Sequence, residues 1–259
     1  YPQWNFSEGD QDVWIFDIDR RTKTRFTLDP AIEGLPLFSP DGTQLAFTRR
    51  ADGSWNNNHI KDLEGSGEAR WLVPREVHDG PVAFSSDGRW LTLFEYAGEG
   101  GQGVMLVDLQ EGSVEPLLQT RYAETGGELS PDDSWIAYSS DKSGRIDAYV
   151  ASFPDVDRVE LQISVDGGQW PVWNPRGGEI FYSRGGSLFV VPIETNGDLV
   201  IGQPRELFSG PYKLDLGFDV FPDGERFLIL KRRTREPVYE LQVVENWFTE
   251  FERLAPTGR

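Results

Sequence analysis

A short turn motif recurs five times along this 259-residue chain at nearly constant spacing. In each copy an apolar or aromatic residue leads into a turn built on Pro-Asp-Gly or a close variant, and a second apolar run follows at once. The residues at the proline position are 46, 45, 44 and 47 positions apart. A repeat in the forties with several short strands per unit is typical of the blades of a β-propeller. The copies are Phe38–Gly42, Phe84–Gly88, Leu129–Asp133, Trp173–Gly177 and Val220–Gly224.

The runs between the turns predict an all-β chain that forms one domain over residues 1–259, a six-bladed β-propeller of four-stranded antiparallel blades. The first and last blades are expected to be abbreviated, because 13–18 and 25–28 match only a third and a fourth strand, and 240–244 is a third strand without an obvious fourth. Apolar residues at helical spacing predict a short C-terminal helix at about 247–254. The expected blades span about 1–30, 31–75, 76–120, 121–165, 166–210 and 211–246.

Composition narrows the possible partners. A formal net charge of −18 argues against nucleic acid, because phosphate binding depends on clustered Lys and Arg. The chain has no cysteine, which excludes disulfides, thiolate metal sites and cysteine nucleophiles. No stretch approaches the roughly 18 to 20 apolar residues of a membrane helix, so we expect no direct membrane insertion.

The Ser-Pro-Asp-Gly repeats resemble the TolB-like and WD-repeat-like β-propellers of bacteria. The C-terminal half resembles in particular the propeller domain of bacterial serine/threonine kinases and related regulators. This resemblance implies an interaction or sensing domain and an extracytoplasmic location. The stretches that carry it are 147–154, 162–168, 179–182, 206–212 and 246–248.

The repeat also predicts which residues face the central channel of a propeller. The residue two positions before the proline position is apolar in every copy, so it should pack between blades. Alternation then directs the residue three positions before it toward the channel. This second set contains two carboxylates that could hold a cation or raise each other's pKa by like-charge repulsion, although a water-filled channel is the simpler interpretation. The set is Gln3, Leu37, Ala83, Glu128, Val172 and Asp219.

Residues that precede the inner strands should lie at the channel mouth. Aromatic residues beside polar ones are typical of peptide and sugar sites, but propellers also use Trp for packing alone. The candidate ligand-binding residues are His78, Asp79, Gln169, Trp170, Tyr212 and Asp215, with Gln3, Glu128 and Asp219 as the channel or possible metal positions.

Motifs for catalysis or cofactor binding are weak. The two histidines, His59 and His78, occupy unrelated repeat positions and so do not predict a metal site. The glycine-rich stretch 98–103 fits a dinucleotide pattern, but it falls between two strands rather than between a strand and a helix, so we interpret it as a loop. No Gly-x-Ser-x-Gly motif is present. We therefore expect no cofactor apart from a possible channel cation.

The sequence favours one function and keeps a second as the alternative. The first is a non-catalytic binding or sensing module for a protein, peptide or cell-envelope ligand, possibly a carbohydrate. The second is a propeller lyase or hydrolase that acts on a saccharide or peptide through His78, Glu128 and Asp219. The second function requires these three residues to converge on one pocket.

Overall fold

A computed structural model describes residues 11–50, 57–64, 67–98, 101–195, 198–232 and 239–244. The chain divides into two compact units, one made of residues 1–99 and 105–115 and the other of residues 100–104 and 116–259. The boundary passes through strands β9 and β10 of one sheet. Each unit is considered by itself below. The described residues include no helix of the length and hydropathy needed to span a bilayer.

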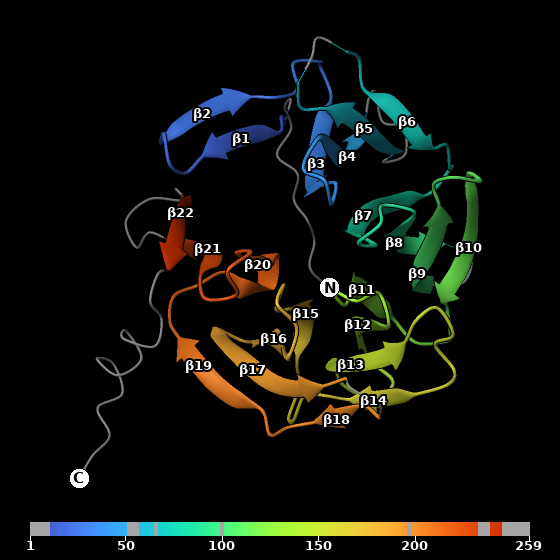
Figure 1. Ribbon diagram of the computed structural model, residues 1–259, viewed down its shortest axis with the longest axis vertical. Helices are drawn as coiled ribbons and strands as arrows, with labels where there is room; N and C mark the ends of the chain where they lie inside the picture. The colour runs from blue at the N-terminus through green and yellow to red at the C-terminus, as the bar shows by residue number, and fades with distance from the viewer. Residues whose placement is uncertain are drawn as a thin grey trace. The chain divides into compact units, whose positions relative to one another are not determined.

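The first unit is built from antiparallel sheets whose strands follow one another in sequence (Figure 1). The first sheet has two strands, and the second and third have four each, in the orders β3-β4-β5-β6 and β7-β8-β9-β10. The bounds are β1 Trp14–Asp17, β2 Thr22–Arg25, β3 Ile32–Phe38, β4 Gln44–Arg50, β5 Asn57–Asp62, β6 Arg70–Val73, β7 His78–Phe84, β8 Trp90–Gly98, β9 Gly101–Asp108 and β10 Ser113–Leu118.

The second unit repeats this plan. One sheet has the order β11-β12-β13-β14, the next has β15-β16-β17 with β18 and β19 both paired to β17, and the last has β20-β21-β22. The bounds are β11 Glu124–Leu129, β12 Trp135–Ser140, β13 Asp147–Ser152, β14 Glu160–Gln162, β15 Gln169–Trp173, β16 Glu179–Arg184, β17 Ser187–Glu194, β18 Val200–Ile201, β19 Arg205–Ser209, the 3₁₀ helix η1 Leu214–Leu216, β20 Phe218–Val220, β21 Phe227–Arg232 and β22 Tyr239–Val244.

The recurring motif closes the β3-β4, β7-β8, β11-β12, β15-β16 and β20-β21 hairpins, as predicted. In one copy the Gly88 N–H donates to the Ser85 carbonyl at 2.9 Å, and Ser85 Oγ donates to Asp87 Oδ1 at 2.6 Å. The same hydroxyl accepts the Trp90 N–H at 2.8 Å. Serine and aspartate therefore satisfy the turn's own polar groups, and glycine supplies the positive φ that ends the turn.

A bulge interrupts the first strand of four sheets just before the turn. The register shifts between Gly34 and Leu37, Pro81 and Ala83, Gly126 and Glu128, and Gln169 and Val172. An extra residue on one strand re-aims the side chain that follows it. The bulge therefore decides how the residue three positions before the turn is presented.

The prediction that the apolar residue before each turn packs between sheets holds for only part of the chain. Leu129, Trp173 and Val220 are buried, and Phe84 is half-buried, but Phe38 is 53% exposed. Phe84 lies against residues of the preceding sheet. For Phe38 the preceding sheet is β1-β2, whose described part consists of these two strands.

The ends of the chain differ from the prediction in one described place. The second strand of the first sheet runs over 22–25 instead of 25–28, because a tight turn with Arg21 at φ 53° starts it earlier. The third strand of the last sheet is confirmed as β22. The predicted helix at 247–254 lies outside the described residues, and the count of six blades stays a prediction.

Candidate ligand-binding sites

Two carboxylates occupy equivalent positions on inner strands of the second unit. Glu128 lies on β11 and Asp219 on β20, each three residues before the turn, and β15 packs against both strands. The bulge at Gly126 and Gly127 precedes Glu128, with φ values of 86° and 120°. A Cβ on Gly127 would lie 2.7 Å from Val104 Cγ1, so only glycine fits there.

The two carboxyl groups interact electrostatically. Burial raises the pKa of Glu128 to about 8, and repulsion from the charge of Asp219 adds to the rise. Burial also raises the pKa of Asp219, although a hydrogen bond from the Val220 N–H opposes the shift. No cation is among the groups that shift either pKa, so within the described part of the chain the pair lacks a positive partner.

The pair alone does not amount to a metal centre. The described residues contain no group of three or more His, Cys, Asp or Glu side chains placed to hold a metal ion. Two uncompensated carboxyls fit a single ammonium or guanidinium group instead, which they could bind through charge-assisted hydrogen bonds. Gln3, the third residue predicted beside them, lies outside the described residues.

Asp79 and His78 belong to the first unit, at the start of β7. Asp79 is buried and accepts hydrogen bonds from Asn58 Nδ2 at 2.7 Å and Arg75 at 2.9 Å. Arg75 also contacts Glu95 Oε2 at 2.5 Å. Burial raises the pKa of Asp79 to about 6, partly offset by Arg75. Its carboxylate is thus engaged within the protein, while burial and Arg50 lower the pKa of His78 and favour the neutral imidazole.

Gln169 and Trp170 open strand β15. Side chains from two strands hold their backbone. The Trp170 N–H donates to Ser139 Oγ of the neighbouring sheet at 3.0 Å, and the Gln169 carbonyl accepts from Ser183 Oγ of the paired strand β16 at 3.2 Å. Trp170 has φ 54°, which is strained for a non-glycine residue. The indole is half-buried, so part of it remains accessible to a ligand.

Tyr212 and Asp215 flank the start of η1. The Tyr212 ring packs edge-on against Phe208 at 5.4 Å between centroids, and a Cβ on Gly210 would lie 2.7 Å from it. Asp215 is exposed and lies 3.6 Å from Lys213 Nζ. The Tyr212 ring is therefore in contact with neighbouring residues of the protein, and the Asp215 carboxylate is paired with Lys213.

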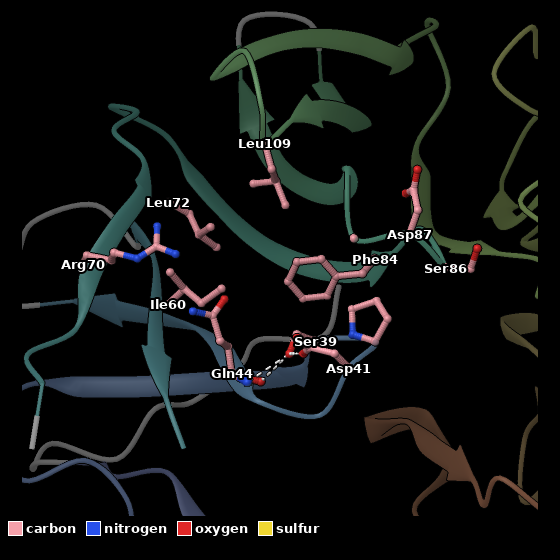
Figure 2. A pocket seen from close by; sticks show the side chains of 12 residues that line it. Ser39, Asp41, Gln44, Ile60, Arg70, Leu72, Phe84, Ser86, Asp87 and Leu109 are labelled. Atoms are coloured by element: carbon pink, nitrogen blue, oxygen red, sulfur yellow. Dashed lines mark hydrogen bonds between the residues drawn. The ribbon is translucent and has the colours of Figure 1, made fainter. Parts of the chain in front are cut away.

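A pocket in the first unit was not predicted. It has a volume of about 360 Å³ and lies between the sheets β3–β6 and β7–β10, beside their two turns (Figure 2). Sequence reasoning treated these turns as structural only. The sequence places Pro40 and Phe84 at the turns of successive repeats, and this could have indicated that the two turns lie side by side. The position of Arg70 on β6 depends on strand pairing that the repeat does not specify.

Comparison with known proteins supports the fold and leaves the activity open. No family model matches the chain. Tricorn protease homolog 1 of Streptomyces coelicolor is 25% identical over 184 residues, which is 64% of this chain but only 16% of that protein. The chain thus spans about a sixth of the length of this curated relative.

Solved structures confirm the TolB-like β-propeller fold. TolB from Acinetobacter baumannii matches with a TM-score of 0.72 at 16% identity, over 90% of this chain and 57% of that one. Oligogalacturonate lyase from Vibrio parahaemolyticus matches with a TM-score of 0.57 at 12% identity, over 90% of this chain and 71% of that one. The same fold therefore occurs in an enzyme as well as in TolB, and residues have to decide the function.

Proposed function

We propose that this chain is a non-catalytic binding or sensing module, and that Glu128 and Asp219 receive a cationic group of a protein or peptide ligand. The observation that carries the proposal is the absence of a described cation beside this carboxyl pair, together with the raised pKa of Glu128. A ligand ammonium or guanidinium would compensate the negative charge for which the described residues supply no cation.

The chemistry of the pair fits reversible binding. At neutral pH Glu128 is largely protonated, because its pKa is about 8. A bound cation favours the ionised form, so binding should release a proton from the pair. Each carboxyl group stands on a strand with one antiparallel partner, β12 for Glu128 and β21 for Asp219, and this pairing helps to keep it in place without a ligand.

The enzyme alternative needs a third group beside the carboxyl pair. The predicted third group, His78, is favoured in its neutral form by burial and by Arg50, and Asp79 beside it is engaged by Arg75 and Asn58. We also propose that the chain forms a six-bladed ring, that it lies outside the cytoplasm, and that it is related to the propeller domains of bacterial serine/threonine kinases.

The experiment is calorimetric titration of the chain with a tripeptide blocked at both ends and carrying a central lysine. The control peptide carries norleucine, which has a similar length without the charge. We expect the lysine peptide to bind, and Glu128→Gln to weaken its binding at least tenfold. Asp157→Asn removes one exposed charge from the same unit and should leave the affinity unchanged.

Two results would contradict the proposal. Equal affinity for the lysine and norleucine peptides would show that the carboxyl pair does not bind the cation. Turnover of an oligosaccharide or peptide that disappears in Glu128→Gln would show that the same residues are catalytic.

A further inference from the structure

The pocket of the first unit combines an apolar floor with charged ends. Its floor is made by Ile60, Leu72, Phe84 and Leu109. Ile60 is buried, and the other three side chains pack at the edge of the core formed by β8, β9 and β6. The floor is therefore held in shape by the core and does not depend on a ligand for its form. Its volume of about 360 Å³ lies near the lower end of small-ligand pockets, which start at roughly 300 Å³.

Arg70 supplies positive charge at one side of this pocket. Its guanidinium extends beside Leu72 and Ile60 (Figure 2). Among the residues that the structure describes, no carboxylate pairs with it. A guanidinium without such a partner can donate two parallel hydrogen bonds to the carboxylate of a ligand.

The two turns supply negative charge at the other side. Asp41 and Asp87 line the pocket, and Figure 2 shows Asp87 on the opposite side of the apolar residues from Arg70. Hydrogen bonds from Ser39 and Ser85 are the main cause that lowers the pKa of these two carboxyls, so both are ionised at neutral pH. The described bonds to Asp87 use only its Oδ1 atom, which leaves Oδ2 for a ligand.

This arrangement selects against ligands with one charge. A simple anion would be attracted by Arg70 but repelled by the carboxylates of Asp41 and Asp87. A simple cation would be attracted by these carboxylates but repelled by Arg70. A ligand with a carboxylate at one end, an ammonium at the other and an apolar body between them matches all three parts of the pocket. A short peptide with free termini and an apolar side chain has this chemistry.

We propose that this pocket binds a short peptide, of two or three residues, through both of its free ends. The C-terminal carboxylate contacts Arg70, the apolar side chain covers the floor at Phe84, and the terminal ammonium faces Asp87 and Asp41. This site is separate from the carboxyl pair of the other unit, and it would bind whether or not that pair does.

The test is calorimetric titration with the dipeptide Leu-Leu, its N-acetyl form, its C-terminal amide and Gly-Gly. We expect Leu-Leu to bind, and each blocked form and Gly-Gly to bind at least tenfold more weakly, because each lacks one of the three contacts. Arg70→Gln should weaken Leu-Leu at least tenfold. Arg158→Gln removes an exposed arginine elsewhere and should have no effect.

Several outcomes would overturn the assignment. Unchanged affinity for Leu-Leu in Arg70→Gln would refute the contact with Arg70. A loss of affinity counts as support only if thermal melting shows that Arg70→Gln and Arg158→Gln are both folded. Full affinity of the N-acetyl form would mean that the ammonium has no role. Loss of Leu-Leu binding in Glu128→Gln, with Arg70→Gln normal, would place the dipeptide at the carboxyl pair instead, and so would support the proposed function while refuting this pocket.

Discussion

One turn position in this protein requires a positive φ, and glycine fills it in all copies but one. Gly42, Gly88, Gly177 and Gly224 have φ between 68° and 75°, and Asp133 stands in the equivalent place with φ 55°. Glycine reaches this region without steric cost, whereas a residue with a Cβ is strained there. Aspartate tolerates it better than most residues, which explains its presence.

Asp133→Gly should therefore stabilise the chain by about 0.5 kcal/mol, since the relief of strain exceeds the entropy that glycine adds to the unfolded state. Gly42→Ala should destabilise it by about 1 kcal/mol. A Cβ at position 42 would meet no atom within 4 Å, so the backbone alone would cause the loss. Urea unfolding measures both changes. A stabilising Gly42→Ala would show that the turn is not under this constraint.

Glu128 should make the stability depend on pH in a defined window. Its pKa is about 8 in the folded chain against 4.5 for the ordinary group. Between these values the folded state holds a proton that the unfolded state has lost, so stability falls as pH rises from about 4.5 to about 8 and then levels off. Glu128→Gln cannot ionise and should remove this part of the slope.

The measurement is urea unfolding of both forms at several pH values from 5 to 9. Asp157→Asn controls for the loss of one negative charge from the surface. Because the glutamine side chain keeps the shape of the protonated acid, the variant should be more stable than the parent at pH 9 and about equal at pH 5. Parallel pH curves for the two proteins would disprove the buried character of Glu128.

At the scale of elements, one buried carboxylate holds two loops onto β13. Asp147 Oδ1 accepts hydrogen bonds from Ser164 Oγ at 2.7 Å and the Gly167 N–H at 3.0 Å. Its Oδ2 accepts from Ser143 Oγ at 2.6 Å and Arg145 Nε at 3.2 Å. The loop before β13 and the loop after β14 are thus joined through one side chain that solvent does not reach.

Asp147→Ala should destabilise the chain by about 3 kcal/mol, because it leaves four donors without their acceptor. Ser143→Ala removes one of these bonds and should cost about 1 kcal/mol. Amide hydrogen exchange at Gly167 should become faster in Asp147→Ala. Unchanged exchange at Gly167 with a normal unfolding free energy would mean that the loops are held by other contacts.

The inner-strand bulge shows which elements the sequence could predict. The turns were predicted because Ser, Pro, Asp and Gly each have a local reason to be there, and the strands followed from the alternation around them. The bulge was missed because the residue five positions before the turn has no common chemistry. In the four sheets with a bulge it is Leu35, Pro81, Gly126 and Trp170, of which all but Pro81 have positive φ.

The candidate sites divide in the same way. The equivalent inner-strand positions of Glu128 and Asp219 could be predicted because they depend only on the distance of each residue from the turn, which β11 and β20 share. Their role in binding stays a prediction. The engagement of Asp79 could not, because its partners Arg75 and Asn58 come from a loop and from another strand. To predict the pocket around Arg70, one would have to know how the outer strands pair. The four-residue strand β6 is too short to show a clear alternation of apolar and polar residues.

At the scale of the whole molecule, the excess of acidic side chains is a source of repulsion. There are 43 Asp and Glu residues against 25 Lys and Arg, a formal charge of −18. Many of the ion pairs in the described residues are exposed, such as Arg176 with Glu225 at 3.8 Å. Exposed pairs of this kind contribute at most about 1 kcal/mol each, and many contribute nothing measurable.

Salt should therefore stabilise this protein. Raising the ionic strength from about 0.01 to 0.15 M shortens the Debye length from about 30 to 8 Å, which screens repulsion between distant carboxylates more than it weakens close pairs. We expect a gain of about 1 kcal/mol, which corresponds to a rise in Tm of roughly 2 to 4 °C for a chain of this size. The rise should be the same in sodium chloride and sodium perchlorate at equal low ionic strength, because screening does not depend on the identity of the anion. A fall in Tm in both salts would mean that close ion pairs, rather than the net charge, dominate the electrostatic free energy of the folded chain.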